Sequence, residues 1–390
     1  YTPITSEAAM QYRTMGPRVP ERVSALGFGC MRFPKTNDEP QRIERAESRR
    51  MLEYAIEAGV NYVDTAWPYH GGESEEFVGE VLDGDLRKQV YLATKMPVWE
   101  VKEPADLDRI FDRQLEKLRT DYIDFYLLHA LNEERLDAVV EHKMIEWGAK
   151  QKEAGRIRYL GFSFHDELPV FKRIVDQYDK WDFCQIQYNY MDEKNQAGTA
   201  GFRYAADRGL AIVVMEPLLG GALANTPEAV QAVFADAGKD RSPVEWAFDW
   251  LWDKEHVGTV LSGMSSMQQV TEDVEYASRS SVGMLSEAEL ELFPRAKKAY
   301  ESLQPVPCTQ CNYCMPCPYG VDIPGNFDIF NTYYKFGDRD QAVARYNRHM
   351  PEDARASACT RCEECLPKCP QSIAIPDCLE RVNEELAVAG

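Results

Sequence analysis

The sequence lacks any apolar run long enough to cross a bilayer. A membrane-spanning helix needs about 20 consecutive apolar residues, and no stretch of this 390-residue chain approaches that. Its first residues also lack a basic segment followed by an apolar one, the pattern of a secretory signal. We therefore expect neither a membrane span nor export. We interpret residues 1–9 as a remnant foreign to the natural protein, with Met10 as the natural first residue.

Positive charge is also scarce. The chain has 44 Lys and Arg against 64 Asp and Glu, a formal net charge of −20. Nucleic acids and anionic membranes bind basic surfaces, so we expect neither as a partner. Hydrophobic residues make up 44%, which is ordinary for a soluble globular protein. The length exceeds what one hydrophobic core usually serves and predicts two domains.

Cysteine is nearly absent from the first 300 residues, where only Cys30 and Cys184 occur. The other nine of the eleven fall between Cys308 and Cys378. A disulfide framework belongs to secreted proteins, whereas clustered cysteines in an intracellular chain indicate metal ligands. We therefore expect a cytoplasmic protein with one domain over 10–300 and a metal-binding domain over 301–390.

Residues 20–280 alternate short β-rich runs with longer amphipathic segments, helical at 47–58, 107–118, 136–152 and 243–252. The predicted strands are 25–29, 61–64, 90–95, 122–128, 159–163, 183–187, 211–215 and 259–261. Eight such β-α repeats predict a parallel sheet closed into a (β/α)8 TIM barrel. An open doubly wound sheet is the rival fold, disfavoured because no GxGxxG turn follows the first strand.

Two four-cysteine runs dominate the last 90 residues. The second, from Cys359 to Cys369, has the C-x₂-C-x₂-C-x₃-C-P spacing of bacterial ferredoxins. The first, from Cys308 to Cys317, has one residue fewer in its last gap and also ends in Cys-Pro. Three closely spaced thiolates can wrap one [4Fe–4S] cluster, while the fourth, turned away by the proline, ligates the other.

This pattern predicts two [4Fe–4S] clusters. We assign one to Cys308, Cys311, Cys314 and Cys369, and the other to Cys359, Cys362, Cys365 and Cys317. Two zinc sites are the alternative, disfavoured because zinc commonly takes paired C-x₂-C clips. We expect Cys378 to be a free core cysteine. The 41 residues between the runs (318–358) have helical patterns near 325–334 and 339–346, so we expect a helix-rich ferredoxin-like domain.

Three successive predicted strands end in reactive side chains. Asp64 and Tyr69 follow the second strand, Lys95 ends the third and His129 follows the fourth. The carboxyl ends of barrel strands converge on the active site, so these four side chains should share one site.

Together the four fit carbonyl reduction. Hydride addition builds charge on the carbonyl oxygen, which needs a proton donor. Tyr69 can donate, but a free phenol with a pKa of about 10 is a weak acid; a neighbouring Lys95 ammonium should lower that pKa. Asp64 would hold Lys95 charged and oriented. His129 could hydrogen-bond the carbonyl oxygen and polarise it.

Over residues 10–280 the sequence resembles an aldo-keto reductase, in the iron–sulfur branch of that family. The motifs that carry the resemblance are Leu26–Arg32, Asp64–Thr–Ala…Tyr69, Gly72–Glu75, Lys95, His129, Gly161–Ser163, Gln185–Tyr188, Pro217–Gly220 and Gly263. The resemblance implies that Asp64, Tyr69, Lys95 and His129 are the catalytic tetrad. It also implies a nicotinamide dinucleotide, NADP or NAD, over the barrel mouth. The implied cofactor-binding residues are Ser163, Gln185, Met215, Glu216, Leu218, Gly220, Gly263, Ser265 and Gln269.

The cofactor-binding segments depart from the family pattern. Phe164 stands where many members have Asn, and Met215 where many stack a Tyr on the nicotinamide. Residues 263–269 have neither the Lys nor the Arg that grip the 2′-phosphate of NADPH in many members. The choice between NADP and NAD therefore stays open, and a flavin in the same phosphate site is an alternative.

Three functions are compatible with these features. The first is an oxidoreductase that reduces a small carbonyl compound, or oxidises an alcohol, with NAD(P)H, while its clusters exchange electrons. The second is a reductase that takes electrons from ferredoxin or another redox protein onto a flavin in the barrel. The third is a non-enzymatic electron-transfer or regulatory subunit. Clusters pass single electrons and nicotinamides pass hydrides, and a flavin is the usual intermediary between them. The second function, with a flavin in the barrel, therefore stays open.

Overall fold

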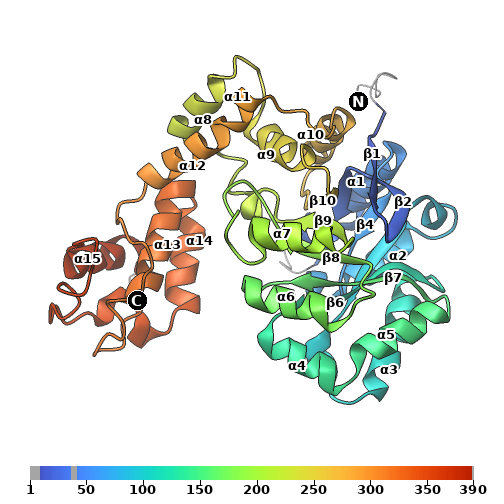
Figure 1. Cartoon of the computed structure of the whole chain (residues 1–390), viewed down its shortest axis with the longest axis horizontal. Helices are drawn as coiled ribbons and strands as arrows, with labels where there is room; N and C mark the ends of the chain where they lie inside the picture. The colour runs from blue at the N-terminus through green and yellow to red at the C-terminus, as the bar shows by residue number, and fades with distance from the viewer. Residues whose placement is uncertain (1–8, 37–41, 389–390) are drawn as a thin grey trace. The chain divides into compact units, whose positions relative to one another are not determined.

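The computed structural model describes residues 9–36 and 42–388. The expected remnant, 1–9, lies outside the described residues except for Ala9. Within the described chain, no helix is both long and apolar enough to cross a membrane. The chain divides into two compact units, one built from the residues up to 220 with 244–286, the other from 221–243 with 287–390 (Figure 1). The predicted boundary at residue 300 remains a prediction.

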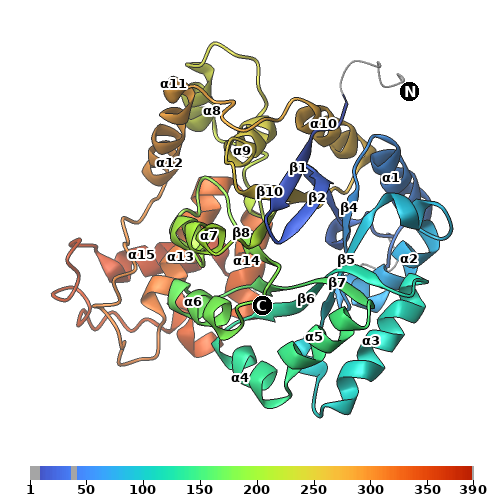
Figure 2. The same ribbon diagram turned by 45° about the vertical axis from the view of Figure 1, so that its right-hand side comes forward.

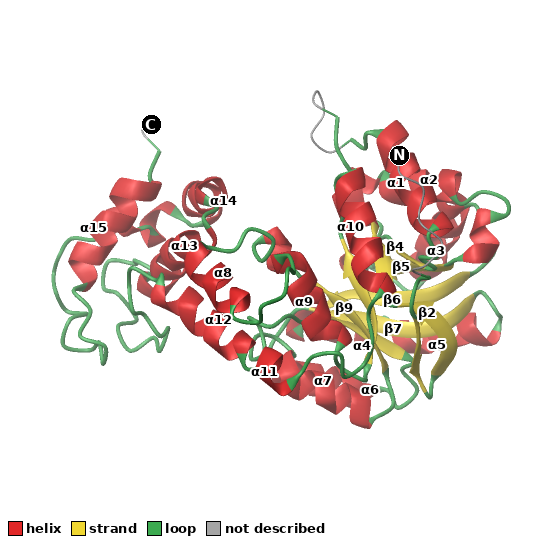
Figure 3. Cartoon of the chain, turned by 90° about the horizontal axis from the view of Figure 1, so that it is seen from above, coloured by secondary structure: helices red, strands yellow, loops and turns green. Residues whose placement is uncertain are grey.

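The first unit is a closed barrel of eight parallel strands, in the order β10-β3-β4-β5-β6-β7-β8-β9. Figure 3 shows these strands in yellow with helices around them. The strands are β3 (Leu26–Gly29), β4 (Tyr62–Asp64), β5 (Tyr91–Met96), β6 (Ile123–Leu131), β7 (Ile157–Phe164), β8 (Phe183–Gln187), β9 (Ala211–Met215) and β10 (Val257–Ser262). The predicted TIM barrel is confirmed, and every predicted strand overlaps an observed one.

Helices connect the strands around the outside of the barrel. They include α1 (Arg45–Glu57), α2 (Ser74–Val81), α3 (Ala105–Leu118), α6 (Leu168–Gln177), α7 (Gly198–Asp207), α9 (Pro243–Trp252) and α10 (Met267–Ser278). Gly59, Gly155 and Gly209 follow helices with φ of 99°, 75° and 74°, a conformation that only glycine adopts freely.

The single helix predicted over 136–152 is wrong. The structure has two helices there, α4 (Glu133–Glu141) and α5 (Met144–Glu153). Lys143 between them adopts a left-handed conformation, with φ 52°, which an α-helix cannot continue through. The apolar spacing crosses this break because side chains of both helices are buried, among them Val139 and Met144.

An antiparallel hairpin, β1 (Tyr12–Gly16) and β2 (Val19–Ser24), precedes the barrel and was not predicted. Its apolar side chains pack with barrel residues near the amino ends of the strands. The hairpin contributes Met15, Val19 and Val23 to this core, and the barrel contributes Tyr62, Phe125, Tyr159 and Phe183. The hairpin thus covers the amino end of the barrel (Figure 2), which leaves the carboxyl ends for the site.

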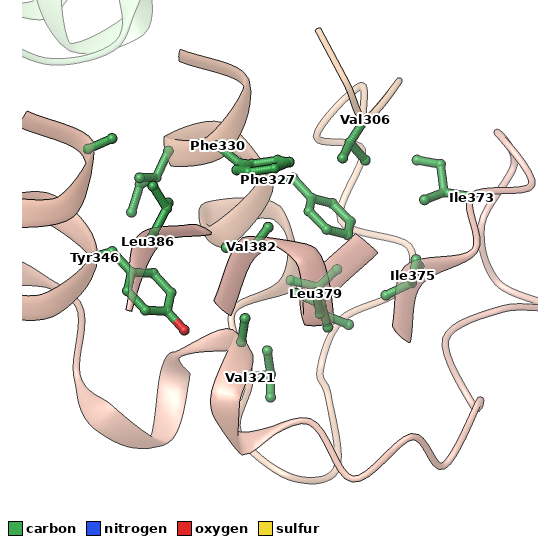
Figure 4. Close-up of a cluster of buried hydrophobic side chains, with 14 residues drawn as sticks. Val306, Val321, Phe327, Phe330, Tyr346, Ile373, Ile375, Leu379, Val382 and Leu386 are labelled. Carbon is green, nitrogen blue, oxygen red and sulfur yellow. The ribbon is translucent and has the colours of Figure 1, made fainter. Parts of the chain in front are cut away.

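The second unit is helical. Its segment 221–243 supplies α8 (Glu228–Ala235), which packs on α12 (Leu292–Ser302) through the Phe234 and Phe293 rings, 5.6 Å apart. After α12 come α13 (Ile323–Phe336), α14 (Arg339–Ala344) and α15 (Ile375–Leu386), so both helices predicted between the cysteine runs are present. Figure 4 shows the core between α13 and α15, with Phe327 and Phe330 beside Leu379 and Val382.

Candidate functional site

Lys95 lies at the centre of the expected catalytic group. It lies on β5 and is completely buried. Its ammonium Nζ donates to Asp64 Oδ1 at 2.7 Å, to the Thr65 carbonyl oxygen at 2.9 Å and to Tyr69 Oη at 3.3 Å. An ammonium has three N–H donors, so this set uses all of them. The structure therefore brings Asp64, Tyr69 and Lys95 into one hydrogen-bonded group, as the strand-end argument predicts.

His129 lies beside that group on β6. Its ring is 6.2 Å from the Tyr69 ring, nearly perpendicular to it, and 5.1 Å from the Trp99 ring. Burial lowers the pKa of His129 well below its ordinary value, and the charges of Lys95 and Arg135 lower it further. The imidazole is therefore neutral at physiological pH, able to donate one hydrogen bond to a carbonyl oxygen without adding charge.

The protonation of Tyr69 differs from the expectation. Lys95 does act to lower the pKa of Tyr69, but burial and the Asp64 carboxylate raise it more, so the net shift is upward. Burial opposes the charge of Lys95, yet Asp64 and Tyr69 together raise its pKa above the ordinary value. The resting group thus holds a neutral phenol and a charged ammonium. That phenol retains the proton that reduction requires.

A buried polar network that the sequence did not reveal holds the backbone of Lys95. The Glu75 carboxylate of α2 accepts hydrogen bonds from Thr94 Oγ1 (2.7 Å) and Gln114 Nε2 (2.6 Å). Gln114 Nε2 also donates to the Lys95 carbonyl oxygen at 3.0 Å, and Lys117 pairs with Glu75 at 3.3 Å. These contacts connect α2 and α3 to β5 and hold the backbone of Lys95 in position.

Three of the expected cofactor-binding residues lie on the neighbouring strands β7, β8 and β9. Ser163 on β7 pairs in register with Gln185 on β8, and Met215 ends β9. Ser163 Oγ accepts from the Ala130 N–H at 2.7 Å, and Gln185 Nε2 lies 3.4 Å from Met215 Sδ. Gln185 Oε1 is buried, and no hydrogen-bond partner reaches it within the described residues. A buried acceptor without a donor is costly, and the amide N–H of a nicotinamide carboxamide would satisfy it.

The connection between β9 and α8 holds three more of them. Glu216 has a left-handed backbone, φ 55°, and its carbonyl oxygen accepts from Asn189 Nδ2 at 3.0 Å. Leu218 is half-buried and Gly220 exposed. After β10, Ser265 and Gln269 bond to one another, with the Ser265 N–H 2.7 Å from Gln269 Oε1. Ser266 caps α10, its side chain accepting from the Gln269 N–H, so Gln269 takes part in both contacts.

Arg32, from the end of β3, supplies a cation that residues 263–269 lack. Its stem lies over Gly263, where an added Cβ would come within 2.9 Å of Arg32 Cδ. A Cβ on Gly220 would lie 3.6 Å from Arg32 Nη2. The side chain is exposed and makes no ion pair with any described residue. Residues 263–269 have no Lys or Arg, but Arg32, in the turn that follows β3, approaches Gly263 and Gly220, which sequence spacing did not show.

Asp273 of α10 accepts a hydrogen bond from Ser262 Oγ, at the end of β10, at 2.6 Å. Burial raises its pKa to about 7, against about 4 for an unfolded Asp.

The folded state thus binds more protons than the unfolded state between these two pH values, and stability should fall as pH rises from 4 to 7. We expect Asp273→Asn to flatten that slope and to raise the free energy of unfolding at pH 8 by on the order of 2–4 kcal/mol. Urea unfolding at pH 5 and pH 8 measures both effects; an unchanged slope would contradict this assignment.

In the second unit the cysteines surround two cavities. Cys308, Cys311, Cys314 and Cys369 line one of them. Cys317, Cys359, Cys362 and Cys365, again with Cys314, line the other. The fourth cysteine of each run thus lies with the first three of the other run, which is the pairing that the spacing predicts. Cys378 lines neither cavity.

The two runs share an unusual backbone. The residues on either side of the second cysteine are left-handed in both: Gln310 and Asn312 have φ of 56° and 61°, Arg361 and Glu363 of 57° and 63°. Such positions are costly for residues other than glycine. Alternating backbone handedness forms concave N–H sites that suit iron–sulfur clusters, and the Gln310 N–H lies 3.4 Å from Cys308 Sγ.

These thiols are not arranged as ligands of a single ion. Across residues 9–36 and 42–388, no group of three or more His, Cys, Asp or Glu side chains could hold one metal ion. Zinc–sulfur bonds of about 2.3 Å would require four thiols to converge on a point. Thiols spread around a cavity suit a larger inorganic cluster instead.

Comparison with known families finds two matches in successive parts of the chain. Residues 25–289 match the aldo/keto reductase family, and residues 307–374 match the 4Fe-4S dicluster domain.

Individual relatives match the barrel. An L-galactose dehydrogenase of Arabidopsis thaliana is 26% identical over 298 residues, 70% of this chain and 92% of the relative. The holo form of an aldo-keto reductase from Bacillus halodurans has 27% identity and a TM-score of 0.61, covering 74% of this chain and 97% of its own. A Klebsiella pneumoniae aldo-keto reductase in complex with NADPH, 20% identical with a TM-score of 0.57, covers 74% and 95% and shows the shared fold.

Proposed function

This chain belongs to the aldo/keto reductase family and carries a 4Fe-4S domain, and on that premise we propose that it reduces a carbonyl group, or oxidises an alcohol, with NADP(H) or NAD(H). The observation that carries the proposal is the Lys95 ammonium bonded to both Asp64 and Tyr69, with His129 alongside. That the chain is an oxidoreductase follows from the family. The cofactor and the roles of the four side chains are our proposal.

Each of the four side chains has a distinct task in this reaction. A nicotinamide, when bound, would supply the hydride for the carbonyl carbon. The neutral His129 imidazole donates a hydrogen bond to the carbonyl oxygen and orients it. Tyr69 transfers its Oη proton to that oxygen as charge develops, so one hydride and one proton convert the carbonyl to an alcohol. Lys95 stabilises the phenolate that remains, Asp64 holds Lys95 in place, and water returns the proton.

Several side chains would hold the dinucleotide. Gln185 Oε1, buried without a partner among the described residues, would accept from the carboxamide, together with the Ser163 hydroxyl. Arg32, whose stem lies over Gly263 and whose Nη2 lies near Gly220, would bind phosphate oxygens bidentately.

Replacing Arg32 tests this placement. We expect Arg32→Gln to raise the Kd of NADPH and NADH by about 10-fold or more, because a hydrogen bond to a charged group contributes about 1.5–3 kcal/mol. Fluorescence titration of the cluster-loaded protein measures both. Arg22→Gln is the matched control, because Arg22 lies on the hairpin at the other end of the barrel. Equal affinities for the two variants would exclude Arg32 from the phosphate site.

The same titration separates the proposal from its main rival. Tight binding of flavin mononucleotide, with no binding of NADH or NADPH, would overturn it and favour a ferredoxin-linked reductase with flavin in the barrel. If the protein binds dinucleotide but turns over no aldehyde of a test panel, the result would favour a non-enzymatic electron-transfer or regulatory subunit.

We also propose that residues 301–390 bind two [4Fe–4S] clusters that exchange electrons with a ferredoxin or another redox protein. Cys311 and Cys362, one ligand for each cluster, are exposed, so both clusters would be near the surface. Iron and acid-labile sulfide content, with absorbance near 400 nm, tests the cluster number. A cytoplasmic location stays a prediction from the cysteine usage.

A further inference from the structure

Arg135 brings an unpaired positive charge close to the catalytic group. It lies in the first turn of α4, where the Asn132 side chain caps its backbone N–H at 2.8 Å. Its guanidinium carbon lies 5.0 Å from the centre of the Trp99 ring. Trp99 in turn contacts His129, and His129 contacts Tyr69. A row of side chains thus leads from the proton donor to a guanidinium.

The chain holds this guanidinium in place. Arg135 Nη1 donates to the Ala130 carbonyl oxygen at 2.7 Å. Ala130 directly follows His129 and has a left-handed backbone, φ 52°; its N–H donates to Ser163 Oγ. Backbone in this conformation is costly for alanine and accumulates at functional sites. Here it turns one carbonyl oxygen toward Arg135 while leaving most of the five guanidinium N–H donors unused.

Charge compensation distinguishes Arg135 from the other cations nearby. Lys95 pairs with Asp64 and Lys117 pairs with Glu75. Arg135, only half-buried, forms no ion pair with any residue of the described chain. A cation without a carboxylate partner, partly removed from water, is poised to bind an anion.

The neighbouring titratable groups do not compensate it. His129 and His165 both have pKa values lowered mainly by burial, and the Arg135 charge lowers both further. The carboxylate on the other side, Glu216, acts on His165. On α4 itself, Glu133 and Glu134 are exposed, and Glu133 pairs with Arg173 of α6.

We propose that Arg135 binds the carboxylate of the substrate, so that the carbonyl compound reduced at Tyr69 is an oxo acid or a carboxylated aldehyde. The planar guanidinium matches a carboxylate through two parallel hydrogen bonds. Trp99 would pack against the carbon chain between the two ends of the substrate. This inference rests on the proposed carbonyl reduction, and it adds the class of substrate.

Binding to the cluster-loaded full chain tests the inference without turnover. Calorimetric titration with benzoate and benzamide compares an anion with a neutral molecule of the same shape. We expect benzoate to bind at least 10-fold more tightly than benzamide. Arg135→Gln should remove that difference, while Arg173→Gln, which removes an exposed arginine next to α4, should retain it. Equal binding of the two molecules by the unmodified protein would overturn the inference, whether or not any variant folds.

Kinetics then separate this inference from the proposed function. With 4-carboxybenzaldehyde and 4-nitrobenzaldehyde as substrates, Arg135→Gln should lower the ratio of their kcat/KM values on the order of 10–100-fold. Turnover of both aldehydes with equal kcat/KM by the unmodified protein would overturn the carboxylate preference and leave carbonyl reduction standing. Selective benzoate binding without turnover of either aldehyde would instead support Arg135 and contradict carbonyl reduction.

Discussion

Replacing Tyr69 by Phe should lower kcat for carbonyl reduction by about 10²–10⁴-fold, the range that a positioned proton donor contributes. The substitution removes the Oη that lies 3.3 Å from Lys95 Nζ and leaves the ring in place. Dinucleotide affinity should change little, because the phenol acts on the carbonyl oxygen. Stopped-flow oxidation of NADPH, alongside a binding titration, measures both.

The barrel offers a matched control for this change. Tyr62 is completely buried, and no described residue bonds to its Oη, so Tyr62→Phe removes a phenol hydroxyl a few residues away without touching Lys95. We expect that variant to keep its activity and its stability. If Tyr69→Phe retained more than about a tenth of the rate, Tyr69 would not be the proton donor, and the Lys95 group would have to serve another purpose.

Replacing Cys369 by Ser should remove about half of the bound iron. Cys369 lines the cavity formed by the first three cysteines of the other run, so its loss should empty that cavity. Cys378→Ser is the control, because Cys378 lines neither cavity, and that variant should keep all its iron. Iron and acid-labile sulfide assays under anaerobic conditions give the stoichiometry.

Double variants decide which cluster Cys369 serves. If Cys369 shares a cluster with Cys311, adding Cys311→Ser should cause no further iron loss, whereas adding Cys362→Ser should remove nearly all of it. Ligation of Cys369 to its own run would reverse the two results. Reconstitution with iron and sulfide before the assay guards against partial loading.

The sequence predicted the barrel because its signals are local. Each strand is a short apolar run, and the glycines after helices mark the same boundaries that the structure has. The split between α4 and α5 was missed because it depends on the left-handed backbone of Lys143. The spacing of apolar side chains does not report the backbone conformation of one residue. The β1–β2 hairpin was missed because only its contacts with the barrel interior make it a strand pair.

The candidate site was likewise predictable in part. Strand order alone places Asp64, Lys95 and His129 at one end of the barrel, and the structure brings them together. The pKa of Tyr69 was not predictable, because its direction depends on burial outweighing Lys95. Arg32 and Arg135 were missed as well. Arg32 approaches Gly263 and Arg135 approaches Trp99, and in each pair the two residues are far apart in the sequence. The spacing of residues along the chain does not predict such contacts.

The packing of α8 on α12 has a consequence for how this chain could be shortened. A module fused end to end could be excised by cutting one linker. Here the backbone passes between the two compact units three times, at 220–221, 243–244 and 286–287. Removing everything beyond residue 300 would remove both cysteine runs but leave α8, which lies between β9 and α9, packed on most of α12. A truncation that is meant to remove the cysteine runs and keep the barrel should therefore retain α12 as the partner of α8.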